Sequence, residues 1–251
     1  FVATTAGGGR IAAAYGGFSA QSGRITVIPG PLAQIDLDVP LQQLVDQPLF
    51  GPATATLRDA YGNVRTLHDL AAEPLQLSCG AGPLVPPLLD DNSLLVEGVI
   101  NIAAAGVTYH GHSAQTILTA TLGSVFSSAE AVSFSGYDIV EVLGGDDTPL
   151  SRLRAGSNSP VKVLIRNNGL MAPSKRVGAI SSLRSHGGRD SSAVVGGSGG
   201  RIETISMELP VSAEEPLQDT LEVQLETAFA VGGQEYPVSA ERTVAVDLVQ
   251  P

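Results

Sequence analysis

Apolar and polar residues alternate along most of this chain, in short segments that Gly, Pro, Asn and Asp interrupt about every 8–12 residues. Alternation with a period of two is typical of β-strands, because successive side chains of a strand point to opposite faces. Helical periodicity is scarce, and only residues 41–45 and 90–96 are expected to form single helical turns. The pattern therefore predicts an all-β fold. The expected strands are residues 10–15, 23–28, 33–39, 53–58, 75–78, 99–104, 115–122, 132–135, 138–142, 160–167, 177–182, 200–208, 220–229 and 242–248.

These strands fall into three blocks. Residues 1–29 contain a hairpin around the Gly16-Gly17 turn, and a hairpin of this size cannot bury a core alone. Residues 30–136 have the size and the number of expected strands of one β-sandwich. Residues 137–251 form a second block of similar size.

Gly-rich stretches interrupt the first and last blocks. Residues 7–9 are expected to break the strand pattern, and they are not a phosphate loop because no Lys-Ser/Thr pair and no helix follow. Residues 185–200 are expected to form a long loop, which is either functional or mobile. Within it, residues 196–200 match the Gly-x-Ser-x-Gly spacing of serine hydrolases but lack the strand-turn-helix context that a nucleophile needs.

The first two blocks contain motifs that resemble the bacterial Ig-like repeats of tandem-repeat surface and adhesin proteins. Residues 11–39 carry an Ala-x-Tyr-Gly-Gly hairpin and a returning strand, as at the end of one repeat, and then a linker and first strand, as at the start of the next. Residues 53–64 are similar to the second strand of the family and to its Asp-x-x-Gly-Asn turn. Gly62 and Asn63 suit a positive φ in a tight turn, and Asp59 is expected to accept backbone N–H bonds there.

The last block carries a weaker motif. Residues 159–170 resemble the strand and turn of CARDB-like and fibronectin-like sandwiches. The resemblances imply tandem antiparallel Ig-like β-sandwiches with an N-terminal strand segment. Residues 30–136 would be an Ig-like β-sandwich, and residues 137–251 would be a CARDB-like or fibronectin-like sandwich. Such an array is extracellular and non-enzymatic.

The first block matches only the end of a repeat, and Phe1 is not a start-codon residue. We therefore expect a processed chain or a piece of a longer one. Three explanations remain open for residues 1–29. They are cut from a longer array, they fold back onto their own sandwich, or they are donated to a neighbouring subunit by β-augmentation. Donation would build a head-to-tail fibre, because a heterologous contact does not close on itself.

Composition and charge argue against several classes of protein. Apolar residues make up 43% of the chain but Trp is absent, so aliphatic side chains must fill the cores. The formal net charge of −11 argues against nucleic-acid binding and against docking on anionic lipid. No apolar run is long enough to span a bilayer. The single cysteine, Cys79, excludes an intrachain disulfide and is expected to be a small buried apolar residue, with interchain pairing or a reactive thiol as the alternatives.

Several polar clusters are candidate sites. His110 and His112 would point the same way on a strand, but two imidazoles without a third ligand favour an exposed strand or loop over a metal site. Calcium at a module junction is the other metal considered, although no Asp-x-Asp-x-Asp-Gly loop is present. Glu214-Glu215 precede Pro216 and are expected to form an exposed turn. The acidic residues considered for calcium are Asp36, Asp38, Asp90, Asp91, Asp138, Asp146 and Asp147, with Asn92.

The sequence thus predicts no enzyme activity, no catalytic, metal or cofactor-binding residues, and a structural module of an extracellular fibre, surface layer or adhesin. The expected partners are other copies of the chain or neighbouring Ig-like modules. The alternatives are a module that binds a glycan or host protein, and a non-catalytic accessory domain of a secreted enzyme. A lectin would need exposed aromatic side chains, whereas most of those here are expected to fill cores. The aromatic residues considered are Tyr15, Phe18, Tyr61, Tyr109, Tyr137 and Tyr236.

Overall fold

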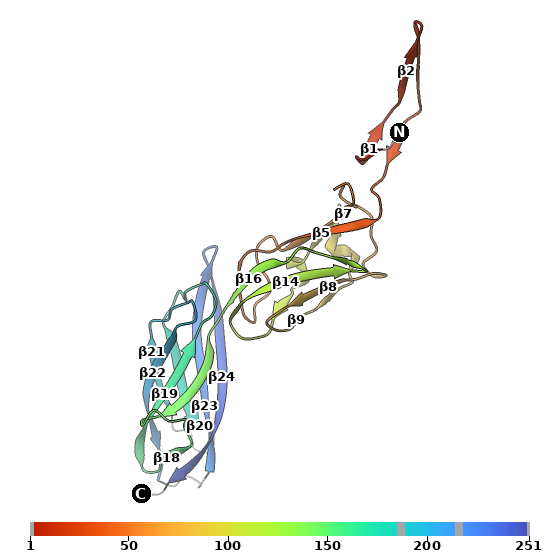
Figure 1. Ribbon diagram of the computed structural model, residues 1–251. Helices are drawn as coiled ribbons and strands as arrows, with labels where there is room; N and C mark the ends of the chain where they lie inside the picture. Colours follow the sequence, from red (N-terminus) through yellow and green to blue (C-terminus); the bar gives the residue numbers. More distant parts are fainter. Residues whose placement is uncertain (1–2, 185–188, 214–217, 250–251) are drawn as a thin grey trace. The chain divides into compact units, whose positions relative to one another are not determined.

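The computed structural model describes residues 3–184, 189–213 and 218–249, and this part of the chain consists of β-strands, two 3-10 turns and connecting loops (Figure 1). The all-β class predicted from alternation is confirmed. The chain separates into two compact units, and the division into blocks at residues 30 and 137 stays a prediction. Unit 1 comprises Phe1–Pro40, Pro48–Thr108 and Ile117–Ala131, and unit 2 comprises Leu41–Gln47, Tyr109–Thr116 and Val132–Pro251.

The chain up to residue 135 forms two larger sheets and several short strand pairs. One sheet is antiparallel with the order β11-β12-β7-β5, and the other has the order β10-β8-β14-β16-β6, with β15 also paired to β14. The strands are β1 (Gly7–Gly9), β2 (Ala12–Tyr15), β3 (Phe18–Gln21), β4 (Ile25–Val27), β5 (Leu32–Asp38), β6 (Gln42–Leu44), β7 (Thr54–Asp59), β8 (Leu75–Cys79), β9 (Leu84–Val85), β10 (Leu88–Leu89), β11 (Leu95–Val96), β12 (Val99–Asn101), β13 (Thr108–Tyr109), β14 (Ala114–Leu122), β15 (Val125–Phe126) and β16 (Glu130–Ser135), and the 3-10 turns are η1 (Asn92–Leu94) and η2 (Ala103–Ala105).

Alternation explains which side chains form the core of unit 1. Every second residue of β7 is buried, namely Ala55, Leu57 and Asp59, while the residues between them are partly exposed. Ile35 on β5 and Ile100 on β12 are also buried, on the strands that flank β7. Because the period of the strand matches the period of the sequence, one face of this sheet is apolar and packs inward.

Unit 2 contains two sheets, with the orders β17-β19-β22 and β18-β24-β23-β20-β21. β17 and β18 follow one another in the chain but belong to different sheets. The inward positions of β19 and β23, including Val163 and Val223, are fully buried, as expected for two sheets packed over one core. The strands are β17 (Asp138–Gly144), β18 (Arg152–Arg154), β19 (Ser157–Arg166), β20 (Val177–Leu183), β21 (Arg189–Val194), β22 (Ile202–Val211), β23 (Gln218–Val231) and β24 (Gln234–Val249).

Residues 3–29, called the ribbon from here on, differ from both sandwiches. β1 pairs with β4 and β2 pairs with β3, all antiparallel, and every residue of β1, β2 and β3 is exposed. Gly16 and Gly17 close the β2–β3 hairpin with φ values of +58° and +84°, as a two-residue type I′ turn requires. The ribbon therefore has secondary structure but no core of its own.

Some local predictions were wrong. The Gly-rich residues expected to break the pattern form β1, which pairs with β4. Residues 41–45 were expected to be helical but contain β6, because pairing in parallel with β16 supplies hydrogen bonds that the local pattern does not reveal. The predicted loop at 185–200 contains β21, which pairs with β20, while residues 185–188 lie outside the described residues. Of the helical turn expected at 90–96, only Asn92–Leu94 is helical, as η1, and Leu95–Val96 form β11. The strand expected at 99–104 ends at Asn101, and η2 follows it.

Candidate functional site

The Asp-x-x-Gly-Asn turn after β7 is organised around one carboxylate. Asp59 is 3% exposed, and its Oδ1 accepts N–H bonds from Tyr61 and Asn63, both at 2.9 Å. Its Oδ2 accepts a bond from the Asn63 carboxamide Nδ2 at 2.9 Å. Gly62 has a φ of +82°. The predicted roles of Asp59 and Gly62 are therefore confirmed, whereas Asn63 does not have the positive φ that was expected.

The same turn also holds distant parts of the chain. Asp59 Oδ2 accepts the backbone N–H of Gly30, in the linker after β4, at 2.9 Å. The Asn63 carboxamide bonds the chain before β1: its Oδ1 accepts the N–H of Ala6 at 2.8 Å, and its Nδ2 donates to the carbonyl of Thr4 at 2.9 Å. One turn thus contacts the ribbon at both of its ends.

The hydrogen bonds to Asp59 stabilise its charged form. The Asn63 side chain makes the largest contribution, followed by the Gly30 N–H, and together with the other N–H donors they lower the pKa of Asp59 from 3.8 to about 2. Burial of the carboxylate works in the opposite direction but is outweighed. Asp59 is therefore ionised, and can accept all of these bonds, at any pH above about 4.

The ribbon presents apolar side chains to solvent on one face. Tyr15 and Phe18 are directly opposed across the hairpin and are 91% and 83% exposed. Ala13 and Ala20 form the next pair on the same face, because alternate residues of a strand share a face. This corrects the expectation that most aromatic side chains fill cores: Tyr109 and Tyr137 do, but Tyr15, Phe18 and Tyr61 are exposed.

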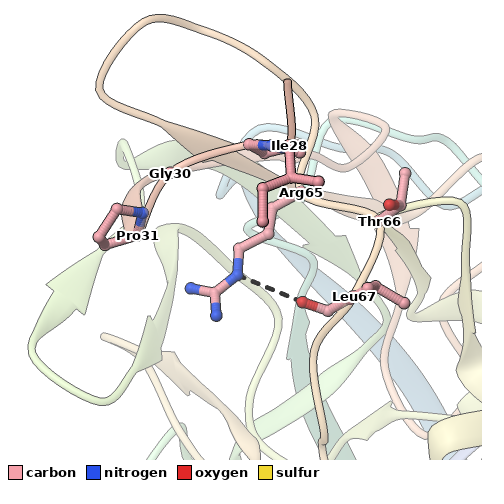
Figure 2. A pocket seen from close by; sticks show the side chains of 7 residues that line it. Ile28, Gly30, Pro31, Arg65, Thr66 and Leu67 are labelled. Carbon is pink, nitrogen blue, oxygen red and sulfur yellow. Dashed lines mark hydrogen bonds between the residues drawn. The ribbon is translucent and has the colours of Figure 1, made fainter. Parts of the chain in front are cut away.

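A shallow pocket of about 430 Å³ lies beside the linker that follows the ribbon (Figure 2). Ile28 and Leu67, on its wall, are 76% and 82% exposed. Arg65 is the one ionisable residue of the lining, and its Nε donates to the carbonyl of Leu67 at 3.2 Å. This lining therefore contains no pair of groups for acid–base catalysis. The residues that line the pocket are Ile28, Pro29, Gly30, Pro31, Arg65, Thr66 and Leu67.

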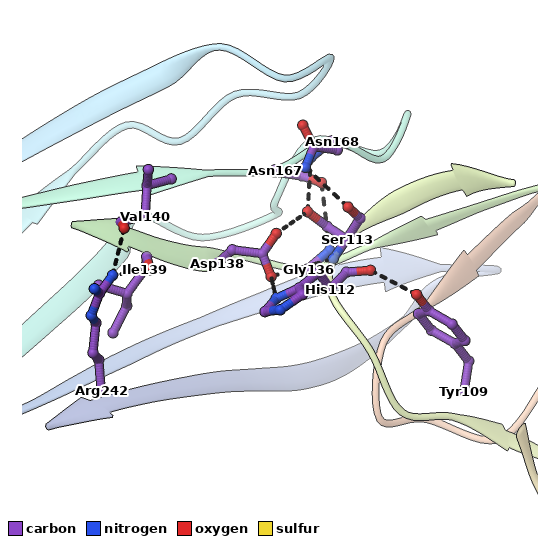
Figure 3. Close-up of polar contacts among 10 residues, drawn as sticks. All are labelled: Tyr109, His112, Ser113, Gly136, Asp138, Ile139, Val140, Asn167, Asn168 and Arg242. Atoms are coloured by element: carbon purple, nitrogen blue, oxygen red, sulfur yellow. Dashed lines mark hydrogen bonds and ion pairs between the residues drawn. The ribbon is translucent and has the colours of Figure 1, made fainter. Parts of the chain in front are cut away.

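In unit 2, Asp138 at the start of β17 is the acceptor of a polar network (Figure 3). Ser113 Oγ donates to its Oδ2 at 2.8 Å, and His112 Nδ1 lies 3.0 Å from its Oδ1. Ser113 Oγ in turn accepts the N–H of Asn168 at 2.9 Å. The Ser113 hydroxyl donates to a carboxylate and not to an imidazole, and the His112 side chain is 92% exposed. This is not the arrangement of a Ser-His-Asp triad. The hydrogen bonds of this network join separate segments of unit 2.

The Gly run 196–200 packs against Tyr137. Gly197 O accepts the Tyr137 hydroxyl at 2.6 Å and the Asn167 carboxamide at 3.2 Å. A Cβ on Gly196 would lie 2.3 Å from the Tyr137 hydroxyl oxygen, which requires Gly at this position. Burial, and next the nearby Glu203 carboxylate, raise the pKa of Tyr137, so it stays a protonated hydrogen-bond donor. This run therefore contributes to packing.

The two histidines considered for a metal have different partners. His110 Nδ1 lies 2.7 Å from Asp46 Oδ1, whereas His112 contacts Asp138. Within the ranges that the structure describes, no group of three or more His, Cys, Asp or Glu residues could hold a metal ion. Cys79, at the end of β8, is not in a disulfide, and it is half-buried instead of fully buried as expected.

The acidic residues considered for calcium lie in separate local contacts. Asp36 pairs with Arg58, and Asp91 accepts the Ser93 N–H at the start of η1. Asp146 accepts bonds from Thr148, and Asp147 pairs with Lys162. Glu214-Glu215 lie outside the described residues. Each of these four Asp carboxylates therefore has its own partner, and no residue is common to two of these four contacts.

Sequence reasoning missed the partners that lie far apart in the chain. Ser113 carries no local motif, and the strand-turn motif that contains Asn167 and Asn168 does not indicate their distant partners. Only the fold brings these residues to Asp138 and Gly136. The contacts of Asn63 with Thr4 and Ala6 were missed for the same reason. An Asn in a tight turn was the one available signal, and it predicts a backbone conformation without naming a distant partner.

Comparisons with known proteins do not identify the chain. No protein-family model matches it, and no curated protein matches its sequence. Among solved structures, it is similar to the three N-terminal domains of the highly immunogenic outer capsid protein (Hoc) of bacteriophage RB49, with 9% identity over 92% of this chain and 74% of that one and a TM-score of 0.30. A Corynebacterium diphtheriae protein described as membrane-anchored gives 10% identity over 93% and 62% of the two chains, with a TM-score of 0.28. Domains 1–6 of the surface layer protein SbsC give 12% identity over 92% and 30%, with a TM-score of 0.21.

At these TM-scores the likenesses carry no argument about function. In the part of the chain that the structure describes, no helix has the length and apolar character to cross a membrane.

Proposed function

We propose that this chain is a structural module of an extracellular fibre or surface layer, and that its ribbon joins it to another copy of the chain. The observation that carries the proposal is the exposed apolar face of the ribbon, centred on Tyr15 and Phe18. A two-stranded sheet is marginal in water on its own, and becomes stable when an apolar face is covered by further strands. Burying one such aromatic side chain contributes about 1.5–3 kcal/mol.

The distribution of charge favours a second copy as the partner. Residues 1–29 contain Arg10 and Arg24 and no Asp or Glu, whereas the whole chain carries a formal net charge of −11. A positive ribbon is attracted to the acidic remainder of another copy and repelled by another ribbon. The contact is therefore heterologous, and repetition of a heterologous contact extends a filament.

Residues outside the ribbon fit a role without catalysis. In unit 2, Ser113, Asp138 and His112 make structural contacts, and the lining of the pocket beside the linker offers no acid–base pair. Antiparallel strands with apolar cores give a module that resists deformation through many lateral hydrogen bonds.

Sedimentation velocity over a wide range of protein concentration tests the proposal. The wild-type chain should increase in average mass with concentration, and the double variant Tyr15→Asp, Phe18→Asp should stay monomeric. Tyr61→Asp is the control for the kind of substitution, because it places one new carboxylate at an exposed tyrosine outside the ribbon and should assemble like wild type.

A wild-type chain that stays monomeric at all concentrations would overturn the proposal. Hydrogen exchange then identifies the alternative. Slow exchange of the amides of residues 7–27 in the monomer would mean that the ribbon folds back onto its own chain, and fast exchange would mean that it is a free hairpin.

A further inference from the structure

We infer that Asp59 and Asn63 form a latch that fixes the base of the ribbon to the rest of unit 1, so that the ribbon does not swing on a free hinge. The latch is defined as these two side chains and the backbone groups of Thr4, Ala6 and Gly30 that they bind. The inference does not depend on what covers the apolar face of the ribbon.

The position of the bonds carries the inference. Thr4 and Ala6 immediately precede β1, and Gly30 follows β4. β1 and β4 are paired over their whole length, with Gly7 opposite Val27 and Gly9 opposite Ile25. The segments that enter and leave the ribbon are therefore held to each other through β1 and β4. Each segment is also bonded to the turn after β7. Swinging the ribbon away from this turn would require breaking hydrogen bonds on both segments.

The chemistry of the latch suits a fixed geometry. The Asn63 carboxamide binds backbone on both sides, as acceptor from Ala6 and donor to Thr4, in the manner of a peptide group. Its second Nδ2 hydrogen is available to Asp59, which sets the plane of the amide. The bonds to Asp59 involve a charged acceptor, and such bonds are stronger than those between neutral groups.

The linker of residues 29–31 restricts the backbone beside the latch. Pro29 and Pro31 flank Gly30, and a proline ring restricts φ. Gly30 keeps an N–H between them, and Asp59 Oδ2 accepts a hydrogen bond from this N–H. A Cβ on Gly30 would lie 3.6 Å from the Cβ of Asp59, an ordinary contact. An alanine at position 30 can therefore keep the N–H bond to Asp59.

NMR relaxation of backbone amides in the whole chain tests the latch. In wild type, the amides of residues 7–27 should tumble with the correlation time of the rest of unit 1. In Asn63→Ala they should show faster independent motion, with amide exchange of Ala6 about tenfold faster or more, because the hydrogen bonds at the base of the ribbon are lost.

Two matched variants separate the latch from general destabilisation. Asn101→Ala removes the side chain of a second Asn of unit 1, whose Oδ1 accepts the Ala104 N–H, and should leave the ribbon as in wild type. Gly30→Ala retains the N–H and should also leave it unchanged. Equal ribbon mobility in wild type and Asn63→Ala, whether both are rigid or both are loose, would overturn the inference. So would an equal loosening by Asn101→Ala.

Discussion

Asp59 stabilises its own turn and also bonds a distant segment of the chain. Its place in an Asp-x-x-Gly-Asn turn predicts the local part of its role, because the turn brings the N–H groups of Tyr61 and Asn63 to the carboxylate. The bond from Gly30 is invisible in the local pattern, since it depends on how the linker approaches β7. The sequence therefore predicts the turn, and only the structure adds its contacts with the ribbon.

The lowered pKa of Asp59 leads to a prediction about pH. The folded state holds this carboxylate at a pKa of about 2, below its ordinary value of 3.8. The folded state thus binds the proton more weakly than the unfolded state. The resulting stabilisation is complete above the ordinary pKa, and is lost as pH falls through about 2. Asp59→Asn should unfold at a lower temperature than wild type at neutral pH, and the difference should shrink across this acidic window.

Thermal unfolding followed by circular dichroism at a series of pH values measures this effect. Asp38→Asn is the control, because it removes the same charge from an exposed position on β5. A difference between wild type and Asp59→Asn that stays constant down to pH 2 would contradict the assigned protonation.

At the scale of the element, alternation predicts a strand well where one face of the strand is buried. It predicts poorly where the strand forms only because it pairs with a neighbouring strand. From Ser159 to Arg166, buried residues of β19 alternate with residues that are exposed or partly exposed, and a strand was predicted at residues 160–167. β6 has three residues and owes its extended form to parallel pairing with β16, so its local pattern was misread as helical. β21 is rich in small polar residues and contains no apolar stripe, but pairing with β20 along its length makes it a strand.

Turn chemistry gives a prediction for the long β23–β24 hairpin. Gly232 and Gly233 have φ values of +58° and +85° and connect the paired residues Val231 and Gln234. A two-residue turn with both φ values positive is type I′, which favours Asn-Gly and disfavours β-branched residues. Gly232→Asn should change the free energy of unfolding by less than about 0.5 kcal/mol. Gly232→Val should lower it by about 1–2 kcal/mol.

Urea denaturation monitored by a probe within unit 2 distinguishes these two variants. Equal effects of Asn and Val would mean that the positive φ is not what selects Gly at this turn. The comparison is internal, because both substitutions add a side chain at the same exposed position.

At the scale of the whole molecule, composition and alternation predicted the all-β class, because aliphatic residues at every second position leave few other ways to bury apolar surface. What they could not predict is where distant segments meet. The cluster of Asp138, Ser113 and Asn168 depends on three separate segments of unit 2. The exposed state of Tyr15 and Phe18 was also not predicted, since an aromatic pair in an alternating hairpin is equally consistent with a core.

The uneven charge of the chain leads to a prediction about the rate of assembly. If the ribbon docks on an acidic second copy, the double variant Arg10→Glu, Arg24→Glu should associate about tenfold more slowly at low ionic strength. The two arginines are exposed, so their removal changes the field around the ribbon without removing a core residue. The difference should shrink in about 1 M salt, where the Debye length falls to about 3 Å.

The matched control is Arg154→Glu with Arg201→Glu, which gives the same net charge but reverses two exposed arginines of unit 2. Stopped-flow light scattering would measure both double variants beside wild type. The control should associate at least as fast as wild type, because it makes the acidic part of the chain more acidic. Equal slowing of both double variants would show that total charge, and not the positive ribbon, controls assembly. No change in either would remove the electrostatic argument for a second copy as the partner.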